Sequence, residues 1–412
     1  MSQWTPDWTL QIAGVDYANI TLANLTIASG RTDIYSQPRA GYCTFEIINL
    51  DTAAIVAQVN DGVIIRVKDS SGDLVNLFGG EITDVTVSVR TAGTTGITQL
   101  ISITALGALS KLSRSLTNGV LSKDFDGNQI YDVLQDLLVN NWNEVSPAET
   151  WATYNPTEKW KNAQNVGLGE IDRPGNYELM ARTSNETDFY SLVSALATSG
   201  LGYIYESATG AIGYADSTHR TTYLATNGYT NVSANDALVG GLQTITRISD
   251  VRNKVSIEWR SGTHTTTDAQ SIALYGQQAS VINTTLHNGT DATSQAAFYL
   301  ALRAYPQAQF QAITFTLGNS ELTDGDRDAL LNVFMGLPLN IEDLPNNMVD
   351  GRFQGFVEGW VFRAAYNRLD LTLTLSPTAF SLQFMQWQDV SVAEKWNTLS
   401  NTLTWDKATV VA

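Results

Sequence analysis

The side chains that most often carry catalysis or bind metals are few in this sequence and are not spaced for either task. The chain of 412 residues holds three histidines, His219, His264 and His287, in separate segments and without the paired spacing of a metal site. Its single cysteine, Cys43, excludes an internal disulfide and every site built from several cysteines. The phosphate loop, the dinucleotide-binding glycine motif and the nucleophile elbow are also missing. The sequence therefore assigns no catalytic, cofactor-binding or metal-binding residue, and no cofactor.

Two short acidic segments resemble calcium loops but have the wrong residues at the deciding positions. They run from Asp124 to Asn128 and from Asp324 to Asp328. A calcium loop needs glycine at its sixth place and glutamate at its twelfth, and neither segment has them. Because each segment precedes an apolar helical run, we expect helix capping instead. The paired carboxylates of a glycoside hydrolase meet only in space, so the 41 acidic residues leave that class open.

Composition indicates a globular protein of several domains that does not bind nucleic acid. With 43% hydrophobic residues the chain can bury large cores, and its length exceeds what one core usually supports. The net charge is -17, whereas proteins that bind the phosphate backbone of nucleic acids need an excess of basic residues on the binding surface. Met1 to Leu10 shows no secretory pattern, and apolar stretches fall short of about 20 residues. We therefore expect a chain assembled in a cytoplasm, without stable membrane insertion.

The expected secondary structure changes along the chain, from strands in the first region to helices in the next. From Trp8 to about Ser113, short apolar alternations recur between glycine-containing turns, which is typical of an antiparallel barrel or sandwich. Apolar residues at helical spacing follow from Ile130 to Leu138, and a capping-box pattern begins a second helix at Thr183. Gly200 is expected to end that second helix, and a β-hairpin is expected in the residues that follow.

Strand texture returns near Leu242, interrupted by one helix expected from Ala292 to Ala304 and stopped by Pro306. A weak internal repeat links this region to the first one. Three ordered matches have offsets of 274, 276 and 270 residues, and they pair the following segments: 61–67 with 335–341, 77–82 with 353–358, and 101–105 with 371–375. The repeat predicts two related β-barrel domains.

We thus expect a mainly β protein with an α+β insertion. The predicted domains are a first β-barrel at 1–113, an α+β domain at 114–241, a second β-barrel at 242–377 and a Trp-rich extended arm at 378–412. Trp387, Trp396 and Trp405 stand nine residues apart in the arm, a step that places them on no single side of a helix or strand. They could fill pockets on a neighbouring subunit or cover this chain's own barrel.

Several segments resemble minor tail proteins of long-tailed bacteriophages. At the amino end these are Gly30 to Gly41, Phe45 to Asn49 and Leu77 to Val85. Toward the carboxyl end they are Phe353 to Trp360 and Leu371 to Pro377, followed by the Trp-rich arm. The resemblance spans nearly the whole chain and is to the baseplate-hub type of these proteins.

The resemblance implies a structural virion protein at the tail tip, not an enzyme. Such hubs are homotrimers of two related barrels with an α+β insertion, so six near-equivalent units can stack on a six-fold tube above a three-fold tip. The implied partners are the distal tail protein or tail-tube ring, the tape-measure protein, a spike and other minor tail proteins. DNA would pass through a central channel without specific binding. Two alternatives remain open: a carbohydrate-binding adhesin that uses Trp151 and Trp160, and a glycoside or peptidoglycan hydrolase.

Overall fold

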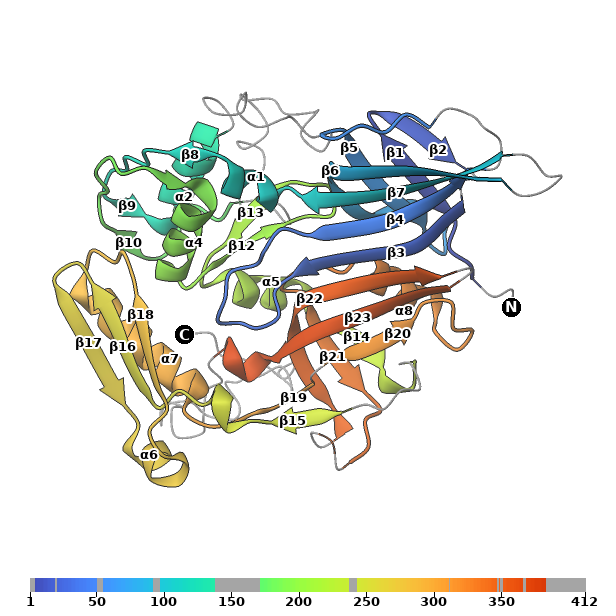
Figure 1. Cartoon of the computed structure of the whole chain (residues 1–412). Coiled ribbons are helices and arrows are strands. Elements are labelled where there is room, and N and C mark those ends of the chain that lie inside the picture. Colours follow the sequence, from blue (N-terminus) through green and yellow to red (C-terminus); the bar gives the residue numbers. More distant parts are fainter. Residues whose placement is uncertain are drawn as a thin grey trace.

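The computed structural model describes residues 4–18, 21–49, 55–91, 97–137, 171–236, 243–310, 312–346, 348, 351–365 and 368–382. Its largest element is one sheet of twelve strands built from both ends of the chain (Figure 1). The amino-terminal strands are β1 (Trp8–Ile12), β2 (Val15–Ala18), β3 (Thr21–Gly30), β4 (Tyr42–Asn49), β5 (Gly62–Lys68), β6 (Leu74–Thr91) and β7 (Ile97–Gly107). The later strands are β14 (Thr230–Ser233), β20 (Ile313–Thr316), β21 (Pro338–Glu342), β22 (Phe353–Ala365) and β23 (Arg368–Pro377).

The two β regions share this sheet, whereas the sequence predicted two separate barrels. The strand order runs β14-β21-β22-β3-β4-β7-β6-β5-β1-β2, with β23 paired to both β22 and β20. Among the described residues this order is an open path with ends at β14 and β2, so closure into barrels is not observed. The first hydrophobic core draws side chains from both regions, including Phe45, Ile65, Phe315 and Leu371.

The three repeat matches fall on two meanders with the same strand order. β6 pairs antiparallel with β5 and β7, and β22 pairs antiparallel with β21 and β23. Each central strand also has a register shift against the strand that follows it, between Ile82 and Asp84 and between Val357 and Gly359. These irregularities lie 275 residues apart, within the range of the sequence offsets.

Strands β3 and β22 form the seam between the two β regions. They pair antiparallel from Gly30 opposite Gly359 to Leu25 opposite Ala364. The backbones approach closely at the first pair, because a side-chain Cβ at Gly30 would overlap the carbonyl of Glu358. Gly30 also has φ of +87°, a conformation that favours glycine. Glycine at this position therefore permits the chain to leave the seam.

The α+β insertion packs around a second core. Its elements are α1 (Leu109–Arg114), β8 (Leu116–Thr117), β9 (Asp124–Phe125), α2 (Asp126–Asp136), β10 (Glu178–Leu179), β11 (Thr187–Asp188), α4 (Phe189–Ser199), β12 (Tyr203–Glu206), β13 (Ile212–Ala215) and α5 (His219–Asn227). Both predicted helices and the hairpin are present. The capping-box prediction at Thr183 was wrong, since Asp188 caps α4 by accepting from the backbone N–H of Ser191. Gly200 stands at the end of α4, as predicted.

A further unit forms between the insertion and the last strands and joins the same second core. It contains β15 (Thr244–Thr246), β16 (Lys254–Trp259), β17 (Gly262–Thr267), α6 (Ala269–Tyr275), β18 (Ala279–Asn283), α7 (Gly289–Arg303) and β19 (Ala308–Phe310). Val255, Ile257 and Ala296 pack with side chains of the insertion. Figure 1 shows β16, β17, β18 and α7 of this unit beside the insertion and away from β1 to β7, whereas β15 and β19 lie next to the later strands of the large sheet. Phe310 of β19 accordingly belongs to the first core. The predicted boundary at residue 242 therefore does not separate the two cores.

Both calcium-like segments begin helices. Asp126 lies in the first turn of α2, and Thr323 caps α8 (Asp324–Leu331) by accepting from the backbone N–H of Asp326. Within the described ranges no cluster of three or more acidic, histidine or cysteine side chains could hold a metal ion. No helix in that part of the chain is long and apolar enough to cross a membrane. Trp151, Trp160 and the three tryptophans of the arm lie outside the described residues.

Candidate functional site

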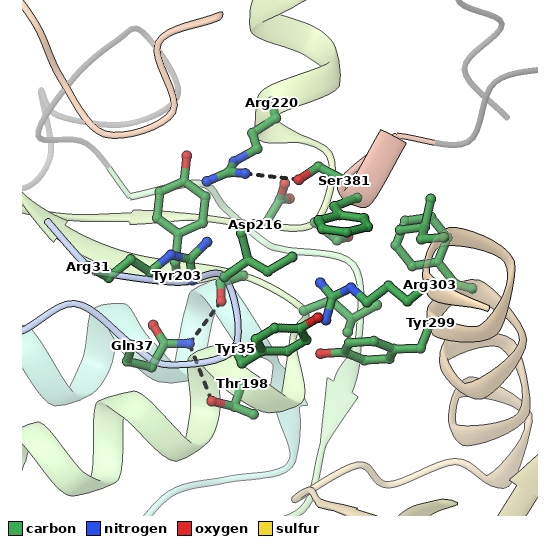
Figure 2. A pocket seen from close by; sticks show the side chains of 17 residues that line it. Arg31, Tyr35, Gln37, Thr198, Tyr203, Asp216, Arg220, Tyr299, Arg303 and Ser381 are labelled. Atoms are coloured by element: carbon green, nitrogen blue, oxygen red, sulfur yellow. Dashed lines mark hydrogen bonds between the residues drawn. The ribbon is translucent and has the colours of Figure 1, made fainter. Parts of the chain in front are cut away.

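A group of buried charged side chains lies where the sheet meets the insertion. Three segments distant in sequence converge there: the loop that follows β3, the insertion elements β12 and α5, and strand β22 with the short helix η8 (Thr378–Phe380). Figure 2 shows Arg31, Arg220 and Tyr203 from these segments close together. We call the ion pairs of Glu358 with Arg31 and Arg220 the junction cluster.

Glu358 is the centre of the junction cluster. Its carboxylate accepts hydrogen bonds from Arg31 Nε at 2.7 Å, and from Arg220 Nη1 and Nη2 at 2.8 and 2.9 Å. Ser376 Oγ donates a further bond at 2.5 Å. Only 1% of the Glu358 side chain is exposed. Burial alone would raise the pKa of Glu358, but the charges of Arg220 and Arg31 and the bonds from Arg220 and Ser376 lower that pKa to about 2. Through these ion pairs, ionised Glu358 links strand β22 to the loop after β3 and to α5.

The two arginines are held by more than Glu358. Arg31 also donates to the carbonyl of Ser36, and Arg220 donates to Ser381 Oγ at 2.9 Å. Both guanidinium groups lie over the ring of Tyr203, at 5.2 and 4.8 Å from its centroid. Cation–π contact with a buried ring offsets part of the cost of removing a guanidinium from water. The cluster therefore fixes the direction in which the chain leaves both β3 and η8.

Glu206, at the end of β12, joins the insertion to the first β region by a different interaction. Its carboxylate accepts hydrogen bonds from the backbone N–H groups of Gly41 and Leu109. A side chain at Gly41 or Gly107 would overlap this carboxylate. Burial raises the pKa of Glu206 to about 7, although both backbone bonds act to lower it. No cation pairs with Glu206 among the described residues, so its hold on the two segments depends on pH.

Asp126 is a second buried carboxylate with a raised pKa. It accepts from the hydroxyl of Tyr214 at 2.5 Å and from the backbone N–H of Tyr177 at 2.8 Å. Burial raises its pKa to about 6, while the bonds from Tyr214 and Tyr177 act to lower it. These partners lie within the insertion, so Asp126 organises that domain and not the junction.

The three histidines lie in different segments of the structure. His219 lies at the start of α5, with Nδ1 2.7 Å from Asp172 Oδ2. Among the described residues no hydroxyl or thiol is hydrogen bonded to His219, so this pair is not part of a nucleophilic triad. His264 contacts Thr266 on β17, and His287 contacts Arg260. The structure does not bring the three histidines into one site.

Sequence reasoning did not find the junction cluster. Its members stand at positions 31, 220 and 358, and no short motif contains them. One signal was available: Glu358 is the only acid in this strand, and the residues on both sides of it, Phe356-Val357 and Gly359-Trp360, carry no polar side chain except the indole of Trp360. A buried carboxylate at such a position needs a cation, which identifies the need but not the partners.

No protein-family model and no curated protein matches this sequence. Solved structures do share its fold. The 43 kDa tail protein of prophage MuSo2 from Shewanella oneidensis has a TM-score of 0.54 at 11% identity, covering 91% of this chain and 99% of that one. The tail protein from Neisseria meningitidis MC58 has a TM-score of 0.56 at 9% identity, covering 92% and 98%.

These similarities show that the chain shares the fold of these two tail proteins. They extend over nearly the full length of both relatives and over both the sheet and the insertion. The resemblance seen in the sequence is therefore supported by the fold, and the predicted mainly β architecture is confirmed. At sequence identities of 11% and 9%, the structural similarity shows a shared fold but does not show that the proteins have the same role.

Proposed function

We propose that the chain is a structural hub at the distal end of a phage tail tube. The observation that carries the proposal is the near-complete mutual coverage with two tail proteins. The candidate site supports it, because the buried ion pairs of Glu358 with Arg31 and Arg220 link three segments that are distant in sequence. Such a site suits a scaffold that transmits load between domains, and no catalytic role is proposed.

The hub is a homotrimer of about 135 kDa, three times the chain mass of 44.9 kDa. Its two β regions are related domains separated by the α+β insertion. The shared strand order of the β5-β6-β7 and β21-β22-β23 meanders supports this division. Three chains with two similar units each give six near-equivalent contacts, which adapt a six-fold tube to a three-fold tip.

The remaining partners follow from that position. The upper face of the trimer meets the tail-tube ring or distal tail protein, with the tape-measure protein in the lumen and a spike and other minor tail proteins below. The arm carries Trp387, Trp396 and Trp405 to contacts between subunits. DNA passes through a neutral to acidic channel, since basic lumen residues would hold phosphates and slow ejection.

Light scattering and class-averaged electron microscopy of the full chain, alone and with particles of the phage or prophage that encodes it, test this proposal. We expect three-fold averages with pseudo-six-fold features on one face, and antibody label at the tail tip. Deleting residues 383–412 should leave the body folded and abolish incorporation into tails. Label elsewhere on the particle, or a fully incorporated deletion variant, would contradict the hub assignment.

A further inference from the structure

A small cavity lies beside the junction cluster, and three arginines and three tyrosines contribute to its lining. Its volume is about 90 Å³, room for one small ion. The side chains that matter are Arg303 at the end of α7, Arg31, Arg220, Tyr35 and Tyr299. Figure 2 shows the guanidinium of Arg303 reaching from α7 toward the loop that carries Tyr35 and Gln37.

Arg303 is a buried cation without an acceptor among the described residues. Only 8% of the residue is exposed, and its Nε–H has no hydrogen-bond partner. Its contacts are the rings of Tyr35 and Tyr299, at 4.7 and 4.9 Å from the guanidinium carbon. Cation–π contact compensates part of the lost hydration but leaves the buried Nε–H unpaired. A buried guanidinium in this state is costly unless an anion joins it.

The surrounding charges also favour an anion. Burial lowers the pKa of Arg303, and the positive charges of Arg31 and Arg252 lower it further, although Tyr299 and Tyr35 act to raise it. The one carboxylate that lines the cavity is Asp216, which is occupied by bonds from Thr218 and Asn176. Glu358 is already shared between Arg31 and Arg220. The arginines that line the cavity are Arg31, Arg220 and Arg303. Asp216 and the neighbouring Glu358 balance two of these three charges, so one positive charge remains at the cavity.

We propose that this cavity binds one small oxyanion, a carboxylate or a phosphate, on the guanidinium of Arg303. The fork of N–H donors on a guanidinium matches the oxygen spacing of both groups. The cavity wall combines α7, the loop after β3 and η8, so an anion bound there ties the α7 unit to the β sheet. The site stands on these side chains alone and is independent of a role in a phage tail.

Thermal unfolding of the full chain tests the site with three probes: sodium phosphate, sodium acetate and a blocked aspartate (N-acetyl-aspartate amide). Each is titrated against sodium chloride at equal ionic strength. At ten times its Kd, a ligand at one site raises Tm by about 2 °C in a chain of this size. A response to phosphate alone identifies a free ion as the ligand. A response to acetate and blocked aspartate identifies a carboxylate, which an acidic side chain of a protein can supply.

Two variants and a control decide the matter. Arg303→Gln should abolish the saturable rise in Tm. Arg303→Lys keeps the charge without the planar fork and should raise the half-saturating concentration about tenfold, which also covers the case in which Arg303→Gln does not fold. Arg368→Gln removes the same charge from an exposed arginine paired with Asp370 and should respond like the wild type. The site is refuted if no probe exceeds chloride, or if the Arg303 variants respond as the wild type does.

Discussion

Replacing Glu358 with glutamine should destabilise the protein strongly and in a pH-dependent way. The Glu358→Gln change keeps the side-chain volume but removes the one negative charge with which both Arg31 and Arg220 pair. Both arginines would remain buried, with 7% and 8% of their side chains exposed. Breaking a buried pair from one side leaves uncompensated charge and typically costs about 3–5 kcal/mol.

The shifted pKa of Glu358 gives an independent magnitude. Burial opposes ionisation, yet Arg220 and Arg31 bring the pKa down to about 2 from 4.5. At 1.36 kcal/mol per unit, the charged form contributes about 3 kcal/mol to folding at pH 7. Because the folded pKa lies below the unfolded one, this stability is present above pH 4.5 and is lost as the pH falls toward 2.

Urea unfolding of wild type and Glu358→Gln, followed by tryptophan fluorescence, measures both effects. Trp360 on β22 is buried two residues away and should report on the seam. The difference in unfolding free energy should fall from about 3 kcal/mol at pH 7 to about 1 kcal/mol at pH 3. Glu321→Gln is the control: this exposed glutamate carries the same charge, and its replacement should change stability by less than about 0.5 kcal/mol. Equal stability of Glu358→Gln and wild type at pH 7, or a difference that does not change with pH, would refute the reasoning.

Three further changes test other parts of the junction and the insertion. Gly30→Ala should cost about 2–4 kcal/mol in urea unfolding because its Cβ overlaps the facing backbone, whereas Gly72→Ala, with φ of +89° but open space around its Cβ, should cost about 1 kcal/mol. Glu206→Ala leaves two buried N–H groups without an acceptor. Burial raises the pKa of Glu206 from 4.5 to about 7. The stability of the wild type relative to Glu206→Ala should therefore be greatest below pH 4.5 and should decrease by about 3 kcal/mol as the pH rises to 8. A stability difference that does not change with pH would contradict a buried carboxylate without a cation partner. Asp126→Asn removes a carboxyl whose pKa is raised by burial from 3.8 to about 6. The unfolding free energy of the wild type relative to this variant should therefore fall by about 3 kcal/mol between pH 4 and pH 7. A relative stability that increases with pH would contradict the raised pKa.

The sequence by itself determined the local elements and the class of fold. Alternating apolar residues predicted the strands of both β regions because strand burial repeats every second residue. Helices α2, α4 and α7 were visible because their apolar faces repeat at helical spacing. Gly200 and Pro306 act through their own backbone, so the ends of α4 and α7 were predictable. The start of α4 was not, since Thr183 and Asp188 offer competing caps and β11 pairs with β8.

Only the tertiary structure decided which distant elements meet. The seam of β3 and β22 joins two β regions into one sheet, and its ion pair links Arg31 with Glu358 across 327 residues. Val255 and Ile257 alternate like any half-buried strand, and the sequence does not say which core they enter. In the sequence, Arg303 looks like an ordinary charged residue at the end of a helix. Only the structure shows that it is buried against the loop that carries Tyr35. Pairing, core membership and buried charge depend on contacts between remote segments, and no local pattern encodes them.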